Sequence, residues 1–167
     1  MAIEIRVATP QEYAEAGEVT AVAYREFVRP EDTGWEDYLA RIADVAERAD
    51  RTTIVVAVAD GRIVGSATLE ISGRVEKHDA RDLDPEEAHV RMLGVHPDVR
   101  RRGIARALME ACMDEARRSG KTFMTLHTTQ RMKAAQEMYE SLGFERAPDH
   151  VFPDGFVLLG YSKRLTD

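Results

Sequence analysis

Residues 89–119, HVRMLGVHPDVRRRGIARALMEACMDEARRS, are the most informative segment for the fold, because their pattern changes from that of a strand to a turn and then to a helix. Residues 89–95 combine β-branched and large apolar side chains, which predicts a strand. His96-Pro97-Asp98 ends that strand, because proline cannot donate a hydrogen bond within a central ladder. From Gly103 onward a helix is predicted, since apolar residues recur at helical spacing: Ile104, Leu108, Met109, Cys112 and Ala116. The segment therefore predicts a strand, a basic glycine turn and a helix.

The turn, Arg100-Arg101-Arg102-Gly103, has the chemistry of an anion site. The first N–H groups of a helix have no partner inside the helix and carry the positive end of its dipole. A glycine allows an anion to approach the backbone, and the arginines add positive charge. The turn therefore predicts a phosphate or pyrophosphate site. The alternative is a solvated basic turn without a ligand.

Two motifs indicate a family. Arg100-x-x-Gly103-x-Ala105, after Leu93-Gly94-Val95, resembles motif A of the GNAT superfamily of N-acetyltransferases. It is not a Walker loop, because the Gly-Lys-Ser/Thr ending is missing, and it is not the dinucleotide fingerprint, because there is no GxGxxG. Residues 135–144, AQEMYESLGF, are similar to the family's Ala-x-x-Leu-Tyr-x-x-Leu-Gly-Phe segment. Met138 replaces the usual leucine there, and Tyr139 falls on the family's tyrosine.

The resemblance implies an α/β fold with α+β layering, in one domain over residues 1–167. We expect a central mixed, mostly antiparallel sheet of about seven strands, with about four flanking helices and a splayed fourth and fifth strand. Alternation and β-branched content predict strands at 3–7, 52–59, 62–71, 89–95, 121–128, 144–147 and 156–164. Helical spacing and turn signals predict helices at 10–28, 35–49, 103–119 and 131–141. The acidic segment 72–88 is either a functional loop or a surface excursion.

The resemblance also implies acetyl-CoA as co-substrate, without a metal. Backbone N–H groups from Arg101 to Arg106 would receive the pyrophosphate, and the strand at Leu93 would pair with the amides of the pantetheine arm. Met132 stands where the family often has a cofactor-binding asparagine, so Thr128 or Thr129 is expected to supply a polar contact. The predicted cofactor-binding residues are Leu93, Gly94, Val95, Arg100, Arg101, Arg102, Gly103, Ile104, Ala105, Arg106 and Thr128.

The reaction implied by the resemblance is direct attack of a primary amine on the thioester, in a ternary complex. Backbone N–H groups would stabilise the oxyanion. Tyr139 is the predicted general acid for the departing thiolate, because an unperturbed tyrosine has a pKa of roughly 10. His89 is the predicted base, either directly or through water. The alternative is that His89 is a core histidine and that the base is Glu70, Glu86, Glu87 or His127.

Composition limits the partners. The chain has 167 residues and a formal net charge of −7, so nucleic acid is not expected as the main partner. Cys112 is the single cysteine, which excludes a disulfide within the chain. We find neither a signal peptide nor an apolar run long enough for a membrane, so a soluble cytoplasmic protein is expected.

The acceptor is expected to be a small-molecule or peptidic amine, and the resemblance allows a homodimer. Four aromatic residues line the acceptor pocket or belong to the core: Tyr24, Phe27, Trp35 and Tyr38. Two other functions stay open. One is an acyl-CoA-binding sensor or structural module of the same fold without catalysis. The other is a phosphate-binding or nucleic-acid-binding domain that uses the arginine turn.

Overall fold

The computed structural model describes residues 1–29, 31–72 and 82–166. These residues form two compact units. Unit 1 comprises Met1–Leu69 and Met92–Cys112, and unit 2 comprises Glu70–Arg91 and Met113–Asp167. The division falls inside strand β4 (Glu87–Val95) and inside helix α4 (Ile104–Arg118). Most of the acidic segment predicted at 72–88 lies outside the described residues, as does Pro30.

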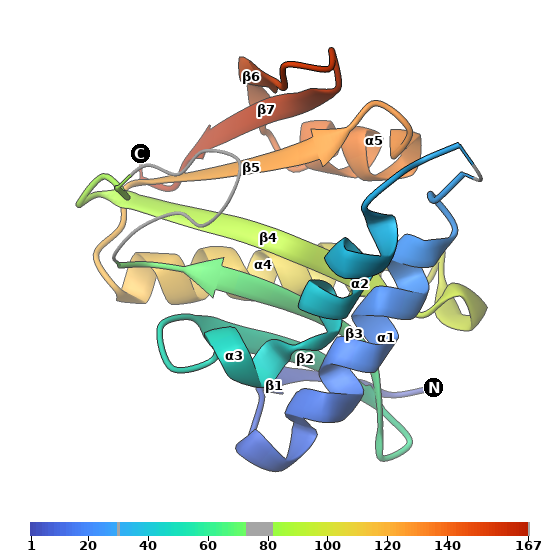
Figure 1. Cartoon of the computed structure of the whole chain (residues 1–167). Helices are drawn as coiled ribbons and strands as arrows, with labels where there is room; N and C mark the ends of the chain where they lie inside the picture. The colour runs from blue at the N-terminus through green and yellow to red at the C-terminus, as the bar shows by residue number, and fades with distance from the viewer. Residues whose placement is uncertain (30, 73–81, 167) are drawn as a thin grey trace. The chain divides into compact units, whose positions relative to one another are not determined.

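The strands form a seven-stranded sheet in the order β1-β2-β3-β4-β5-β7-β6 (Figure 1). The described pairs are antiparallel except β4 with β5, which is parallel. The mixed, mostly antiparallel sheet of seven strands is therefore confirmed. The strand bounds are Ile3–Val7 (β1), Thr53–Ala59 (β2), Arg62–Glu70 (β3), Glu87–Val95 (β4), Phe123–Thr129 (β5), Glu145–Val151 (β6) and Val157–Arg164 (β7).

The β1-β2-β3 meander of unit 1 follows the sequence closely. β2 and β3 are joined at Asp60-Gly61, whose φ angles of 51° and 75° are both positive. Positive φ at both central residues is the requirement of the two-residue turn that this dipeptide predicts. The inward side chains of these strands build the core with α1 (Tyr13–Arg25), and the cluster is Ala8, Ala16, Val19, Val45, Ile54, Val56 and Ile63.

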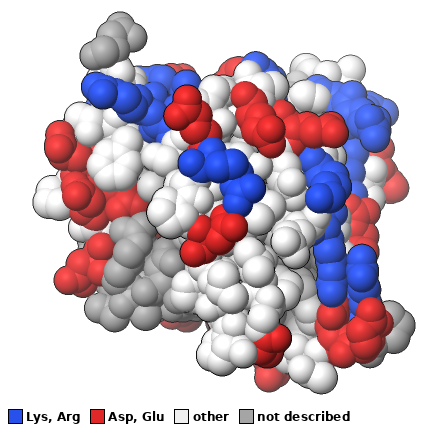
Figure 2. All heavy atoms as spheres, turned by 90° about the horizontal axis from the view of Figure 1, so that it is seen from above, with Lys and Arg blue, Asp and Glu red and all other residues white. Residues whose placement is uncertain are grey.

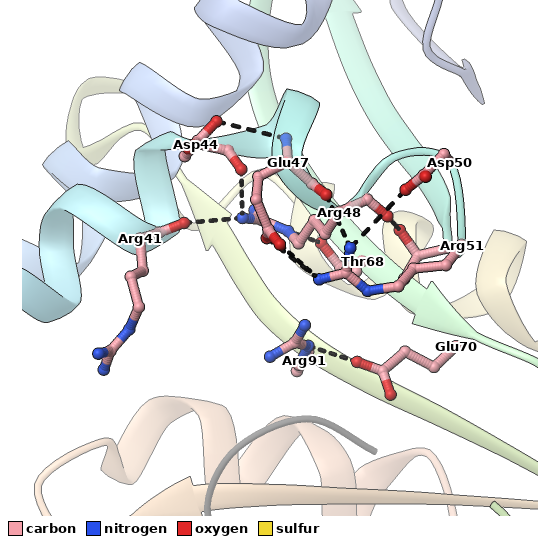
Figure 3. A network of polar contacts seen from close by, with 10 residues as sticks. Arg41, Asp44, Glu47, Arg48, Asp50, Arg51, Thr68, Glu70 and Arg91 are labelled. Atoms are coloured by element: carbon pink, nitrogen blue, oxygen red, sulfur yellow. Dashed lines mark hydrogen bonds and ion pairs between the residues drawn. The ribbon is translucent and has the colours of Figure 1, made fainter. Parts of the chain in front are cut away.

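The prediction of one helix over residues 35–49 is wrong. The structure has α2 (Trp35–Ala43) and α3 (Val45–Arg48), because Asp44 leaves the helical region at φ −87° and ψ 68°. The buried guanidinium of Arg48 holds this break by donating to the carbonyl oxygens of Arg41, Ile42 and Asp44 at 2.9–3.2 Å (Figure 3). The last carbonyl groups of a helix lack partners in a following turn, although the Arg41 carbonyl also accepts from the Asp44 N–H at 3.2 Å. The described residues therefore form five α-helices, not four.

Unit 2 contains the first half of β4, together with β5, β7 and β6. Helix α5 (Lys133–Ser141) follows β5. The buried side chains of unit 2 include Met124, Leu126, Tyr139, Phe144 and Tyr161. β6 runs four residues further than the predicted 144–147. Pro148 indicated an end there, but β6 is the outermost strand and its register shifts between Ala147 and His150. Proline is tolerated at such edges and bulges.

β4 changes conformation at Met92. The parallel ladder with β5 ends at the pair Val90↔Leu126, although β5 continues to Thr129. Met92 then takes a left-handed φ of 55°, which costs a residue with a side chain about 1–2 kcal/mol. Its side chain is buried with Leu39 and Ile42, which offsets part of that cost. The described ladder between β4 and β5 therefore stops before this irregularity, and the splayed pair stays a prediction.

The carboxylate of Glu12 links β1 to the start of the first helical turn. From its bonds we expect a contribution to stability that is lost in acid. Both of its oxygens accept from Arg6 at 2.7 Å, and one accepts from the Thr9 N–H at 2.8 Å. The Arg6 guanidinium, followed by Thr9, lowers the pKa of Glu12 from 4.5 to about 2. A depressed carboxyl pKa stabilises the fold above its unfolded value, and that stabilisation is lost as the pH falls through the folded value.

Glu12→Gln is therefore expected to lower the free energy of unfolding at pH 7, by at most about 1 kcal/mol because the pair is partly exposed. The deficit should shrink between pH 4.5 and pH 2. Urea unfolding at several pH values measures it, with Glu18→Gln on the exposed side of α1 as control. A deficit of equal size at pH 7 and pH 2 would contradict this account.

Candidate functional site

The glycine turn of unit 1 has an open, left-handed backbone. A short 3₁₀ helix (Pro97–Val99) follows β4, and Arg101 and Gly103 then take φ angles of 62° and 77°. The first backbone bond of α4 joins the Ala107 N–H to the Gly103 carbonyl at 3.0 Å, so the N–H groups of Ile104 and Ala105 precede it. A Cβ added to Gly103 would meet no described atom within 4 Å. The turn thus offers backbone donors and open space to an anion.

The three arginines of the turn have different surroundings. Arg100 donates to the carbonyl oxygens of Val95 and Ala23 at 3.3 and 3.2 Å and pairs with Glu26. Its side chain therefore ties the turn to β4 and α1. Arg101 and Arg102 are exposed. Their guanidinium groups are the ones that an anion at the turn can reach.

Gly94 lies where α1 packs tightly on β4. A Cβ at this position would lie 3.0 Å from Ala23 Cβ and 3.2 Å from Thr20 Cγ2, so a larger residue would push α1 outward by a few tenths of an ångström. The neighbouring Val95 is buried and Leu93 is half-buried. One residue later, the His96 N–H donates to the Val64 carbonyl at 2.8 Å. The end of β4 is thus held on β3 and under α1.

His89, in unit 2, is almost fully buried, with 1% exposure. Its Nδ1 lies 2.8 Å from Thr125 Oγ1, and the Thr125 hydroxyl donates to the Glu87 carboxylate. A threonine hydroxyl has one proton to donate, and a carboxylate only accepts. The Nδ1 of His89 must therefore carry a proton, which leaves the lone pair of the neutral ring on Nε2.

A pocket of about 290 Å³ lies in unit 2. His127 lines it, and the His127 ring lies 5.8 Å from the His89 ring between centroids. The lining also includes Thr125, Pro148, Asp149, His150, Gly160 and Tyr161. Sequence analysis missed Thr125 and Asp149. Alternation along β5 could have found Thr125, because it places Thr125 and His127 on one face of the strand.

Asp149 is fixed at the rim of this pocket. Its carboxylate accepts from Arg146 and from the Gly160 N–H, the latter at 3.1 Å. The Arg146 guanidinium, followed by the Gly160 N–H, holds the pKa of Asp149 below its usual range. The Asp149 carboxylate therefore stays ionised at neutral pH, paired with the Arg146 guanidinium.

The other carboxylates considered as bases have partners. Glu70 forms a buried ion pair with Arg91 at 2.5 Å (Figure 3). Glu87 accepts from Thr125, and Glu86 accepts from Thr122 at 3.4 Å. A buried carboxylate that neutralises an arginine is a poor proton acceptor, because its charge is stabilised by the cation. Glu70 is therefore better explained as a structural ion pair.

Tyr139 lies on α5 and is buried, with its ring centroid 6.0 Å from that of Phe144 and 5.9 Å from that of Tyr161. These contacts fix the orientation of its ring. Thr128 donates to the Met132 sulfur at 3.5 Å. Thr129 Oγ1 is buried and has no hydrogen-bond partner within residues 1–29, 31–72 and 82–166. Of the two threonines, Thr129 is therefore the one whose hydroxyl makes no hydrogen bond among the described residues.

A sequence model described as "Acetyltransferase (GNAT) family" matches residues 18–144, which is more than half of the chain. The chain belongs to the GNAT acetyltransferase family. The predicted family is thus confirmed, and the match includes both motifs.

Curated relatives within this family match a shorter segment. The chain is 39% identical over 62 residues to the [ribosomal protein bS18]-alanine N-acetyltransferases of Escherichia coli K12 and of Salmonella typhimurium. That segment is 37% of this chain and 42% of each relative. The chain therefore matches less than half the length of these relatives.

Solved structures of other proteins share the fold. yncA of Salmonella typhimurium, solved with its cofactor acetyl-CoA, has a TM-score of 0.71 at 22% identity, covering 100% of this chain and 96% of that one. The ribosomal-protein-S18-alanine N-acetyltransferase of Escherichia coli has a TM-score of 0.70 at 19% identity, covering 99% and 96%. The paia N-acetyltransferase of Thermoplasma acidophilum, in complex with coenzyme A, has 0.73 at 15% identity, covering 98% and 99%. At these identities the likeness shows the fold alone.

The described residues of this GNAT protein contain no group of three or more His, Cys, Asp or Glu side chains that could hold a metal ion. Among the same residues, every helix is too short or too polar to cross a bilayer.

Proposed function

We propose that this protein is an N-acetyltransferase that moves the acetyl group of acetyl-CoA to a primary amine. The observation that carries the proposal is the turn at Arg101–Gly103, where a left-handed backbone opens onto the first N–H groups of α4. Membership of the GNAT family supports it, as do structural neighbours solved with acetyl-CoA or coenzyme A.

The residues of the turn fit the cofactor. The pyrophosphate would take the N–H groups of Gly103, Ile104 and Ala105, with Arg101 and Arg102 as counter-charges. The Arg100 side chain would act indirectly, by holding the turn. The pantetheine amides would pair with β4 at Leu93–Val95. The bound group supplies an activated acetyl thioester.

In the proposed chemistry, the neutral amine attacks the thioester carbon directly in a ternary complex. A C–N bond forms, the C–S bond breaks, and the sulfur leaves with the bonding electron pair. Backbone N–H groups of β4 would stabilise the oxyanion between these steps. Tyr139 would protonate the departing thiolate, and His89 would belong to the path that removes a proton from the amine.

A peptidic amine is the acceptor class that we propose. The relatives that match 62 residues act on an alanine of ribosomal protein bS18, and the net charge of −7 favours a cationic acceptor. Acidic and basic side chains are interspersed on the face drawn in Figure 2, which is not the continuous basic surface that nucleic acid requires. A cytoplasmic location and a homodimer stay predictions, as does a single domain over residues 1–167.

A thiol-release assay with acetyl-CoA tests the function, using an alanine-initiated peptide, a lysine peptide and spermidine as acceptors. Acetyl-CoA affinity is measured in parallel by calorimetry. Turnover with any of the three supports the proposal. Binding without turnover would instead support the alternative, an acyl-CoA-binding module of the same fold.

Arg101→Gln combined with Arg102→Gln is expected to weaken acetyl-CoA binding about tenfold, because a hydrogen bond to a charged group contributes about 1.5–3 kcal/mol before solvent screening. Calorimetry at constant ionic strength measures the change. The control is Arg62→Gln combined with Arg118→Gln, which removes the same charge from other exposed positions. Equal weakening in both double variants would mean that only net charge matters.

A further inference from the structure

We propose that the pocket of unit 2 receives the acceptor amine and that His127 takes its proton, with Glu87, Thr125 and His89 positioning the imidazole from behind. This inference rests on the proposed acetyltransferase function. It assigns the base to a residue on β5, and it leaves His89 as a positioning residue that acts through His127.

The two histidines differ in their exposure to the pocket. His127 lines the pocket and is half-buried, whereas His89 is 1% exposed and its Nδ1 is bonded to Thr125. A base must come within hydrogen-bond reach of the proton that it removes. The pocket of about 290 Å³ holds roughly ten water volumes, which is enough for an amino group and the first atoms that carry it. An amine in that space reaches His127 before it can reach His89.

The two histidine rings are neighbours. Their centroids are 5.8 Å apart, so His127 lies beside the chain of hydrogen bonds that holds His89. The chain from Glu87 through Thr125 keeps a proton on His89 Nδ1 and directs its Nε2 lone pair away from that bond. The buried Glu87 carboxylate also stabilises a single positive charge on the pair once His127 is protonated.

Other charged and titratable groups around His127 suit a cation. Asp149 and His150 of β6 and Tyr161 of β7 line the same pocket. Asp149 stays ionised because Arg146 and the Gly160 N–H hold it. Burial, followed by the bond to Glu140, raises the pKa of Tyr161, so this phenol stays neutral. Asp149 therefore offers an ionised carboxylate to an incoming ammonium group, beside the Arg146 guanidinium that pairs with it.

The proton balance is complete. The ammonium group gives one proton to His127, and the resulting amine attacks the thioester carbon. The nitrogen loses a second proton as the tetrahedral intermediate collapses and the C–S bond breaks. One proton ends on the sulfur of coenzyme A, and the other passes from His127 to solvent. The net reaction releases one proton for each acetyl group transferred from a protonated amine.

His127→Gln is expected to lower kcat/KM for the alanine-initiated peptide about 10²–10⁴-fold, the usual range for loss of a general base. Acetyl-CoA affinity should stay within about twofold, and the acid limb of the pH profile should disappear. His127→Ala should regain part of the activity with added imidazole. Glu87→Gln should move the acid limb of the active enzyme to lower pH, because it removes the charge that stabilises the protonated pair.

The outcomes separate this inference from the proposed function. An active wild type, with His127→Gln folded by circular dichroism and within threefold of its kcat/KM, overturns the inference and leaves the acetyltransferase function intact. A wild type that binds acetyl-CoA but acetylates none of the three amines overturns the function and the inference together. If neither His127 variant folds, the ring is structural and the inference is wrong.

Discussion

Tyr139→Phe is expected to lower kcat about 10²–10³-fold at neutral pH, because the thiolate of coenzyme A would then leave without its proton donor. The ring contacts with Phe144 and Tyr161 are kept, since only the hydroxyl is removed. The free energy of unfolding should therefore fall by no more than about 1 kcal/mol, the value of one hydrogen bond. KM for acetyl-CoA should change little, because the turn at Gly103 is untouched.

Thiol release at saturating acetyl-CoA measures this effect, with urea unfolding of the same preparation. Tyr13→Phe is the matched control, because Tyr13 is a helical, half-buried tyrosine in unit 1, outside the proposed site. A kcat for Tyr139→Phe within threefold of wild type would show that water or another group protonates the thiolate. Tyr139 would then be a core residue, as most buried tyrosines are.

Gly17→Ala is expected to destabilise unit 1 by about 3 kcal/mol or more, the upper end of what overpacking costs. Gly17 lies inside α1, and a Cβ there would stand 1.9 Å from the carbonyl oxygen of Ala43, at the end of α2. Backbone atoms cannot rotate away as a side chain can. Helix propensity alone predicts the opposite sign, a gain of about 1 kcal/mol.

Guanidinium unfolding measures the Gly17→Ala effect, and the slope of the transition checks that the unfolded state is unchanged. Gly34→Ala is the comparison, because Gly34 has a φ of 78° and no described atom within 4 Å of an added Cβ. It should cost only about 1–2 kcal/mol, from the left-handed backbone. Equal costs at the two positions would show that α1 and α2 can separate freely.

Prediction from sequence succeeded where local chemistry decides. The Asp60-Gly61 hairpin, the alternating strand at Ile3–Val7 and the buried face of α4 all follow from a few neighbouring residues. It failed at Asp44, where the helix breaks because the Arg48 guanidinium satisfies carbonyl groups of α2, and Thr68 of β3, twenty residues further along the chain, holds that guanidinium in place. The prediction also ended β6 too early, because Pro148 is tolerated at a bulge of this edge strand.

For the candidate site, the sequence by itself determined the strand, turn and helix around Gly103 and the family to which the chain belongs. Glycine conformation, helix spacing and local charge are properties of adjacent residues. Contacts between elements far apart in the chain decide that Arg100 pairs with Glu26, that α1 packs tightly against residue 94, and that His89 is enclosed while His127 lines a pocket. Each of these depends on atoms from strands or helices far apart in the chain, and burial and hydrogen bonding at such contacts leave no local pattern in the sequence.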